Sequence, residues 1–514
     1  MSPSSSSGRT SAFNEQGLQK TIDNIVEHLQ ALYRADKDPW VIGYSGGKDS
    51  TAVVQLVWLA ISQLPSDEVQ KPVFVVTTDT LVENPIVSTW VENSLKEMSV
   101  AANKCGLPLQ ANLLKPKLEG RFWINLIGKG YPAPRHKFRW CTERLKINPT
   151  TEFIQNQISS FGEVVLFLGT RRAESTVRAA RLDRQEDVKD QLGLTPHPDL
   201  HGCWVYSPIA NWSNDDVWTF LTQMENPWGY DNHDLLALYR GATADNECPV
   251  VVDTSTPSCG TSRFGCWVCT LVDQDKSMSA MIQNDYEKEW MLPLLELRNE
   301  LDFREEDARK LDRQRRDFRR IRGNITHYRD RDDEVQLVPG PYTQNSRAYW
   351  LKRLMETQKV IQQNPITPDS LKTWKLLELE DLEEIRRIWL EDKREIEDLL
   401  PQIYEEVFEK PYPGEKRDDR RVFDSEALSL LKSQCSEEPL IYELARNLLD
   451  VEWEYRLHGK RKGLFDQLEK QIRRCYYDNE EDALNLQKRK LKLEEGEEQF
   501  EQAQTSSSIE ENSQ

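Results

Sequence analysis

The feature that most restricts the fold of this 514-residue chain is a glycine loop, S-G-G-K-D-S at residues 45–50. It follows a short apolar stretch, WVIG, and precedes a long apolar segment, TAVVQLVWLAISQL. This order predicts a buried strand, a tight loop and then a buried helix. Such a loop binds an anion through backbone N–H groups and the positive end of the helix dipole. A Walker loop is excluded, because Asp49 follows Lys48 where that loop requires Ser or Thr.

Two further apolar segments predict buried strands because they are rich in β-branched residues: VFVVTTDT at 73–80 and EVVLFLGT at 163–170. Helical spacing of apolar residues runs from Gly17 to Leu32, and again after each of the first two strands. Strands that alternate with helices predict an α/β fold, an open doubly wound sheet of parallel strands. Ligands bind such sheets beyond the carboxyl ends of the strands.

Beyond about residue 285 the chain is rich in Glu, Lys, Arg and Leu, with helical periodicity. This change predicts a separate, all-helical C-terminal region. The periodicity is clearest in three segments: residues 289–301, 371–400 and 426–434. We expect four parts along the chain: a disordered tail at 1–12, the α/β domain at 13–285, a charged helical region at 286–494 and a disordered tail at 495–514.

Composition restricts the cellular setting and the partners. The formal net charge of -19 argues against a protein that coats nucleic acid through its whole surface. No apolar run approaches the ~20 residues needed to cross a bilayer, and the Ser-rich start lacks the apolar core of a secretory signal. We therefore expect a cytoplasmic protein without membrane contact. Nine cysteines, an odd number, indicate metal or redox chemistry rather than a disulfide framework.

Charged residues follow two of the predicted strands at their carboxyl ends. Arg171, Arg172 and Arg178 lie in GTRRAESTVR, after the third strand. Arginine forks suit phosphate recognition and stabilise charge in nucleotidyl transfer, although Glu174 could simply pair with one of them. Asp79 ends the second strand, where it could face a nucleotide or cap the following helix. Phosphate chemistry is the interpretation that these positions favour.

Three cysteines gather in SCGTSRFGCWVCT. Cys266 and Cys269 form a C-x-x-C loop, and Cys259 lies seven residues before Cys266. Soft thiolates in such a pattern bind zinc or an iron–sulfur cluster. A fourth ligand must come from elsewhere in the chain.

The segment at residues 309–331 carries nine arginines interleaved with Phe318 and Tyr328. Such density can bind a nucleic-acid backbone, with aromatic rings available for stacking. Asp312 and Asp317 lie among the arginines, so a salt-bridged helix explains the pattern equally well. The sequence leaves both interpretations open.

Several motifs together resemble known families. S-G-G-K-D-S resembles the PP-loop of the ATP pyrophosphatases, which cleave ATP between its α- and β-phosphates. IANWSNDDVW is similar to an I-x-x-W-(S/T)-x-x-D-V-W element of the PAPS reductase branch of that superfamily. Longer segments, among them FWINLIGKGYPAPRHKFRWCTERLKI and LVPGPYTQNSRAYWLKR, resemble the DndC family, the PAPS reductase-like sulfurtransferases of bacterial DNA phosphorothioation. The resemblance covers residues 38–350 approximately.

The resemblance implies an enzyme that hydrolyses ATP to AMP and pyrophosphate, with Mg²⁺, and replaces a non-bridging oxygen of a DNA phosphate with sulfur. It also implies a [4Fe-4S] cluster. The implied partners are DNA, a cysteine desulfurase as sulfur donor and other Dnd modification proteins.

The family motifs place functional residues on this chain. Lys48, Asp49, Arg171 and Arg172 are the expected catalytic residues. The residues expected to contact the nucleotide are Tyr44, Ser45, Gly46, Gly47, Lys48, Asp49, Ser50, Asp79, Gly169, Arg171, Glu174, Ser175 and Arg178. The expected cluster ligands are Cys141, Cys259, Cys266 and Cys269, with Cys248 as the alternative to Cys259. Related reductases with a cluster carry a Cys-Cys pair where this chain has Trp140-Cys141, so a zinc site competes with the cluster.

Three other functions compete with DNA thiolation. A PAPS or adenylylsulfate reductase would need a redox-active cysteine near the C-terminus, and Cys475 lacks such a signature. A tRNA-thiolating PP-loop enzyme would use the same adenylylation chemistry. A non-enzymatic Fe–S scaffold would bind partners without releasing pyrophosphate, which makes pyrophosphate release the discriminating assay.

Overall fold

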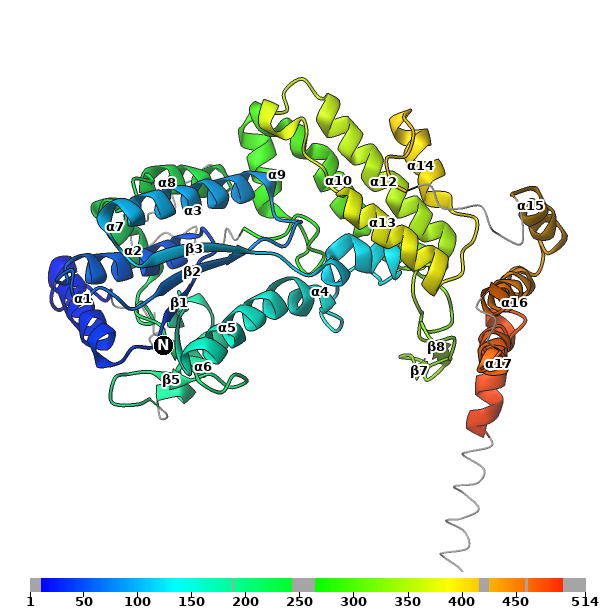
Figure 1. Ribbon diagram of the computed structural model, residues 1–514, viewed down its shortest axis with the longest axis horizontal. Coiled ribbons are helices and arrows are strands. Elements are labelled where there is room, and N and C mark those ends of the chain that lie inside the picture. The colour runs from blue at the N-terminus through cyan, green and yellow to red at the C-terminus, as the bar shows by residue number, and fades with distance from the viewer. Residues whose placement is uncertain (1–10, 187–188, 243–263, 416–424, 458–460, 493–514) are drawn as a thin grey trace, which may run out of the picture. The chain divides into compact units, whose positions relative to one another are not determined.

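The computed structural model describes residues 11–186, 189–242, 264–415, 425–457 and 461–492. These residues divide into two compact units, each of which is described by itself (Figure 1). The first unit comprises Met1–Phe122, Pro134–Leu301 and Val360–Leu376, and the second comprises Trp123–Ala133, Asp302–Lys359 and Leu377–Gln514. The boundary expected at residue 285 therefore lies at residue 301 instead, because α10 (Leu292–Leu301) buries Leu294 and Leu297 in the first unit.

The first unit contains a six-stranded sheet in the order β3-β2-β1-β4-β6-β5. Its strands are β1 (Trp40–Gly43), β2 (Val73–Thr78), β3 (Leu109–Leu114), β4 (Val164–Phe167), β5 (Thr195–Pro196) and β6 (Cys203–Tyr206). All neighbours pair in parallel except β5, which is antiparallel to β6. The predicted α/β class is confirmed, and the three predicted strands become β1, β2 and β4 at the centre of the sheet.

Both faces of the sheet are buried, as a parallel sheet requires. Trp40 and Ile42 contribute to one apolar core and Val41 to the other, because successive side chains of β1 point to opposite faces. The first core includes side chains from α1 (Leu18–Ala35), α2 (Lys48–Ser62), α3 (Pro85–Cys105), α7 (Asn214–Gln223) and α8 (Asn232–Gly241). The second core includes Ile154 of α5 (Asn148–Phe161), which lies on the opposite face (Figure 1).

The remaining elements of the first unit are short. They are η1 (Leu118–Gly120), α4 (Trp140–Thr142), the π-helix η3 (Glu143–Ile147), η4 (Arg172–Glu174), α6 (Thr176–Glu186), α9 (Lys276–Asn284), η5 (Tyr286–Met291), α10 and η6 (Asp369–Leu371). Ser11 and Ala12, which were expected to be disordered, donate hydrogen bonds from the Ser11 hydroxyl and the Ala12 N–H to Asp216. The tail predicted at 495–514 lies outside the described residues.

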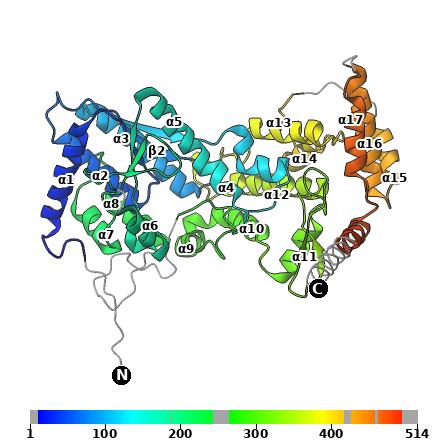
Figure 2. The same cartoon turned by 90° about the horizontal axis from the view of Figure 1, so that it is seen from below.

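The second unit is mainly helical, as expected for this part of the chain. Its elements are η2 (Ile124–Gly128), α11 (Glu306–Gln314), the hairpin β7 (His327–Arg329) and β8 (Val335–Leu337), most of α12 (Gln344–Gln363), α13 (Leu379–Arg387), η7 (Ile388–Asp392), α14 (Leu399–Phe408), α15 (Ser425–Gln434), α16 (Pro439–Leu457) and α17 (Leu464–Arg474). Both views show α16 and α17 side by side (Figure 2), joined by a bond from Asn447 to Gln471 of 3.1 Å.

The long helix predicted at 371–400 is interrupted. Helix α13 begins after Glu378, where a capping box with Asp381 fixes its first turn. The helix ends in the π-turn η7, and Arg394 and Asp398 then adopt left-handed backbone conformations. The spacing of apolar residues alone did not predict where the helix at 371–400 is interrupted. Among the described residues, no helix has the length and apolar character that a membrane span requires.

Candidate active site

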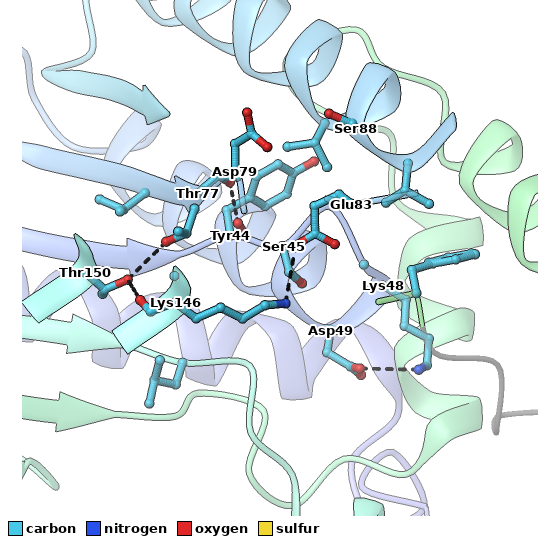
Figure 3. A pocket seen from close by; sticks show the side chains of 18 of the residues that line it. Tyr44, Ser45, Lys48, Asp49, Thr77, Asp79, Glu83, Ser88, Lys146 and Thr150 are labelled. Atoms are coloured by element: carbon cyan, nitrogen blue, oxygen red, sulfur yellow. Dashed lines mark hydrogen bonds and ion pairs between the residues drawn. The ribbon is translucent and has the colours of Figure 1, made fainter. Parts of the chain in front are cut away.

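The carboxyl ends of β1, β2 and β4 surround a pocket of about 900 Å³ in the first unit, a size typical of ligand sites (Figure 3). Its lining includes the glycine loop, the end of β2, the start of α3 and the first turns after β4. The polar residues on its wall include Tyr44, Ser45, Lys48, Asp49, Thr77, Asp79, Glu83, Ser88, Glu92, Lys146, Thr150, Arg171, Glu174, Arg178, Asn214 and Tyr239. The pocket therefore lies where ligands bind in open α/β sheets.

The glycine loop is held rigidly at the N-terminus of α2. The Ser50 hydroxyl accepts a bond from the Ser45 N–H (3.1 Å) and donates one to the Gly47 carbonyl (3.0 Å). Gly46 has φ of +71°, and a Cβ on it would lie 2.3 Å from a methyl group of Val91 on α3. Only glycine fits this turn, which supports a loop that presents its backbone to an anion.

Two buried cations meet one carboxylate beside this loop. The Asp49 carboxylate accepts bonds from Arg171 Nε (2.7 Å) and Lys48 Nζ (3.3 Å), and both cations are at most 6% exposed. Arg171 Nη1 also donates to the Trp212 carbonyl at 3.2 Å. Asp49 thus positions both cations against the pocket, which explains an Asp where a Walker loop has Ser or Thr.

Gly169 explains how the strand end and the loop approach so closely. A Cβ on Gly169 would lie 2.9 Å from the Asp49 backbone carbon and 3.1 Å from the Ser50 nitrogen. The chain after β4 therefore passes directly over the first turn of α2, with no space for a side chain.

Tyr239, near the end of α8, contacts the loop from the opposite side. Its hydroxyl oxygen accepts a bond from the Lys48 N–H (3.3 Å), and its ring lies 5.3 Å from Lys48 Nζ. A Cβ on Gly47 would lie 3.1 Å from the same hydroxyl. The second glycine of the loop is therefore needed for the close approach of Tyr239.

Carboxylates form the wall across from the loop. Burial raises the pKa of Asp79, which accepts a bond from the Leu81 N–H (2.8 Å) and lies 3.8 Å from Lys115 Nζ. Glu83 accepts bonds from the Thr80 hydroxyl (2.9 Å) and from Lys146 Nζ (3.4 Å). The side chain of Lys146 extends along the pocket toward Glu83 (Figure 3).

Lys146 reaches the pocket from an unusual turn. It belongs to the π-helix η3, which follows the short helix containing Cys141. Single π-turns of this kind occur often at functional sites. Interaction with Cys266, and then with Glu83, raises the pKa of Lys146, so this ammonium remains charged.

Cys266 lies directly behind Glu83. Its thiol donates to Glu83 Oε1 at 3.7 Å and lies 3.4 Å from the Thr80 hydroxyl oxygen. Burial raises the pKa of Cys266 to about 12, and the charge of Glu83 adds to the effect. One carboxylate therefore separates this thiol from the pocket.

The structure describes three of the expected cluster ligands, Cys141, Cys266 and Cys269. Burial raises the pKa of the Cys141 thiol, and the charge of Cys269 raises it further, which places these two sulfurs in the same neighbourhood. Nevertheless, the described part of the chain contains no three His, Cys, Asp or Glu side chains grouped so as to hold a metal ion. Cys248 and Cys259 lie outside the described residues. The described cysteines alone therefore do not form a cluster site.

The loop containing Cys269 is clamped from α10. Arg298, 1% exposed, donates from Nε to the Cys269 carbonyl (3.0 Å), from Nη1 to the Asp273 carbonyl (3.3 Å) and from Nη2 to the Val272 carbonyl. The buried guanidinium satisfies several carbonyl groups that would otherwise lack donors.

The structure brings most of the predicted nucleotide residues to one pocket. The predicted residues that line it are Tyr44, Ser45, Gly47, Lys48, Asp49, Asp79, Arg171, Glu174 and Arg178. Gly46, Ser50 and Gly169 support the loop from behind, while the Ser175 hydroxyl accepts a bond from the Arg178 N–H. The guanidinium of Arg172 bonds to Asn211, Asp183 (3.0 Å) and Glu186 (3.2 Å) instead, outside the residues that line the pocket.

Sequence reasoning missed Glu83, Lys146, Thr150 and Tyr239. Glu83 lies in TLVENP, and Lys146 lies near the end of FWINLIGKGYPAPRHKFRWCTERLKI, a segment quoted above only for its resemblance. For Lys146, the only local signal of a role in the site was its position five residues after Cys141, an expected cluster ligand. Tyr239 had none, because its role arises from a contact 191 residues away in sequence.

The arginine-rich segment of the second unit is largely internal. Arg316 donates to the carbonyls of Gly340 (2.8 Å) and Pro339 (2.7 Å), and Arg319 pairs with Asp317 (2.8 Å) and Glu443 (2.7 Å). For these two arginines, the interpretation of the segment as salt-bridged is therefore the one that fits. Others remain at the surface, including Arg309, Arg322 and Arg331.

Comparison with known proteins agrees with this geometry. Residues 39–272 match the phosphoadenosine phosphosulfate reductase domain family. An uncharacterized protein of Methanocaldococcus jannaschii is 25% identical over 280 residues, which cover 54% of this chain and 45% of that protein. An uncharacterized 37.8 kDa protein of Escherichia phage 186 is 27% identical over 133 residues, 26% of this chain and 37% of that protein. The chain thus spans less than half the length of these relatives.

Two solved structures have distant similarity. Phosphoadenylyl-sulfate reductase from Candida auris, a phosphate complex, has a TM-score of 0.24 at 14% identity, covering 41% of this chain and 86% of that chain. Candida glabrata FMN adenylyltransferase has a TM-score of 0.25 at 11% identity, covering 47% and 69%. The sequence match, the SGGKDS loop and the parallel sheet identify residues 39–272 as a phosphoadenosine phosphosulfate reductase-like domain of the PP-loop superfamily.

Proposed function

We propose that this chain is an ATP pyrophosphatase that activates a DNA backbone phosphate for replacement of a non-bridging oxygen by sulfur. One observation carries the proposal: a single pocket has the loop with Lys48 and Arg171 on one wall, and Glu83, bonded to the Cys266 thiol, on the other. The resemblance of the sequence to the DndC family supports DNA as the acceptor, a cysteine desulfurase as the sulfur source and other Dnd proteins as partners.

The first step transfers AMP. A non-bridging oxygen of the acceptor phosphate attacks the α-phosphorus of ATP, and the bond between the α- and β-phosphates breaks. Pyrophosphate leaves with the electron pair, and the loop N–H groups and Lys48 stabilise its charge. A Mg²⁺ ion bound together with ATP would supply further positive charge to this leaving group. Arg171 lies beside Lys48 and stabilises the charge that develops on the α-phosphate.

The second step inserts sulfur. A thiol reductant supplies two electrons and releases the persulfide sulfur of the donor as hydrosulfide. The hydrosulfide attacks the adenylylated phosphorus, a P–S bond forms, and AMP leaves with the oxygen that bridged the two phosphorus atoms. Lys146 supplies positive charge to this side of the pocket, since its ammonium lies 3.4 Å from Glu83. A [4Fe-4S] cluster is a further part of the proposal. Iron and sulfide analysis of anaerobically purified protein tests for it.

Pyrophosphate release tests the proposal. Purified protein with ATP and Mg²⁺ should release pyrophosphate and AMP faster when duplex DNA and a desulfurase with cysteine are present. Lys48→Met should lower that rate at least ~100-fold, since a charge that contacts the leaving group contributes several kcal/mol. Lys115→Met is the matched control, because Lys115 is not among the residues that line the pocket and its Nζ lies 3.8 Å from Asp79. AMP formation that is indifferent to DNA, or full activity in Lys48→Met, would falsify the proposal.

A second candidate, PAPS reduction, is favoured by the family match at residues 39–272. It predicts sulfite release from PAPS with a thiol reductant and no ATP. Cys475, the C-terminal thiol considered for that role, contacts Arg319 at 3.8 Å, and burial raises its pKa to about 11. A neutral, partly buried thiol is a weak nucleophile, so DNA thiolation is the function we prefer.

A further inference from the structure

We infer that Tyr239 is a positioning residue that couples occupancy of the phosphate loop to the segment carrying Cys266. The inference deepens the proposed function and rests on ATP binding at the loop. Its basis is a set of contacts from Lys48 through Tyr239 to Phe264, which lies two residues before Cys266 in the chain.

The first contact is a competition for one hydrogen-bond donor. The Lys48 N–H begins α2, where the helix dipole makes backbone donors favourable for phosphate. The Tyr239 hydroxyl oxygen accepts from this N–H at 3.3 Å. One N–H cannot serve two acceptors at full strength. A phosphate oxygen at the loop must therefore displace the phenol.

The direction of displacement is restricted by packing. The Tyr239 ring meets Trp218 edge-on, with ring centroids 5.1 Å apart, and Trp218 is fully buried. Movement of the ring toward the loop is blocked at Gly47, since even a Cβ there would lie 3.1 Å from the phenol oxygen. The ring packs on its other side against Phe264 at 4.7 Å, and Phe264 is only partly buried. Movement toward Phe264 disturbs the fewest buried contacts.

Phe264 transmits the movement to the cysteine. It lies two residues before Cys266, in a segment that is anchored to the start of α3. Glu83 pairs with Cys266 as an isolated bridge, and the Trp267 N–H donates to the Val82 carbonyl at 2.9 Å. Rotation of Phe264 therefore acts on the bond between the Cys266 thiol and Glu83, at the wall that the pocket shares.

Hydrogen–deuterium exchange of the peptide at 264–272 measures this coupling in the full chain. The probe is α,β-methylene ATP, which cannot be cleaved at the bond that the proposed reaction breaks. In the wild type the probe should change exchange of this peptide. In Tyr239→Phe, which keeps the ring and removes the hydroxyl, the change should fall at least twofold.

Affinity and a second variant make the test specific. Tyr239→Phe should bind the probe about 2- to 10-fold more tightly by calorimetry, because the competing acceptor is gone. Phe264→Leu keeps the Tyr239 hydroxyl as the competing acceptor. In this variant too, the probe should no longer change hydrogen exchange of the 264–272 peptide. Tyr230→Phe is the matched control, since its hydroxyl donates to the Trp90 carbonyl on the same side of the sheet, and it should behave as the wild type.

Each outcome bears on the inference. Equal exchange changes in the wild type and in Tyr239→Phe, with normal binding, overturn the coupling and leave the proposed function intact. Weaker binding by Tyr239→Phe overturns the competition. Absence of probe binding to the wild type overturns both this inference and the ATP site on which it rests.

Discussion

Gly169 is a residue whose lack of a side chain determines the geometry of the site. A methyl group there would lie 2.9–3.1 Å from backbone atoms of Asp49 and Ser50, which cannot move without shifting α2. Gly169→Ala should therefore lower affinity for an ATP analogue at least ~10-fold, about 1.4 kcal/mol, measured by calorimetry.

Gly43→Ala is the control for that variant. Its Cβ would lie 3.4 Å from a Leu168 side-chain atom, an ordinary contact at the end of the neighbouring strand. Affinity in Gly43→Ala should stay within about twofold of the wild type. Equal losses in both variants would show that strand packing, and not the loop, sets the affinity.

Lys393 in the second unit gives a pH-dependent prediction. Desolvation, and then the neighbouring cations Arg347 and Arg474, lower the pKa of Lys393 to about 7, although Glu395 and Asp317 oppose the shift. An unfolded lysine titrates near 10.4. Between pH 7 and about 10.4 the unfolded state therefore binds more protons, so stability of this unit should rise with pH across that window.

Lys393→Met removes this charge. It should stabilise the second unit at pH 7 on the order of 3 kcal/mol, because each pKa unit is worth 1.36 kcal/mol. The gain should shrink as pH rises and approach zero above about pH 10.4, where the unfolded lysine loses its proton as well. Urea unfolding at pH 7 and pH 10 measures the difference, and a gain that is independent of pH would mean that packing alone is responsible.

At the scale of elements, Arg298 connects α10 to the cysteine loop. Arg298→Met should lower the free energy of unfolding of the first unit by about 2–4 kcal/mol, since several carbonyl groups lose a donor and each bond is worth ~0.5–1.5 kcal/mol. Arg298→Lys should lose less. Chemical denaturation followed by tryptophan fluorescence measures both, and equal losses in the two variants would contradict the clamp.

The elements that sequence predicted well are those with strong local signals. β1, β2 and β4 are short β-branched runs buried on both faces, so they were found and their parallel order followed. β3 was missed because it is an edge strand with alternating polar residues such as Gln110 and Asn112. The two-residue β5 offers too short a pattern.

The residues of the candidate site were also predictable only where the signal was local in sequence. The loop residues from Ser45 to Ser50 were predictable, because an anion-binding turn is specified by residues adjacent in sequence. Glu83, Lys146 and Tyr239 were not, because they meet at the pocket only after three separate segments are folded onto the sheet. The internal role of Arg316 and Arg319 was also open, since their carbonyl and carboxylate partners lie up to 155 residues away.

At the scale of the whole molecule, each unit has its own buried interior, which predicts separable unfolding. A saturating ATP analogue, at about 100 times its Kd, should stabilise the first unit by ~2.7 kcal/mol. Lys393→Met should shift the other transition. Calorimetry combined with hydrogen exchange assigns each transition, and a single transition that both changes shift equally would contradict two independent units.

The contact between Gly46 and Val91 has a consequence for how this sequence can vary through evolution. Any side chain at position 46 would occupy the space of the Val91 methyl groups. Gly46 also has a φ of +71°, which alanine rarely adopts and asparagine tolerates. Related chains should therefore tolerate asparagine at 46 only where 91 is glycine or alanine, and should pair a substituted 47 with a residue smaller than tyrosine at 239. Covariation of these two pairs would trace, from sequences alone, the helices that hold the phosphate loop in place.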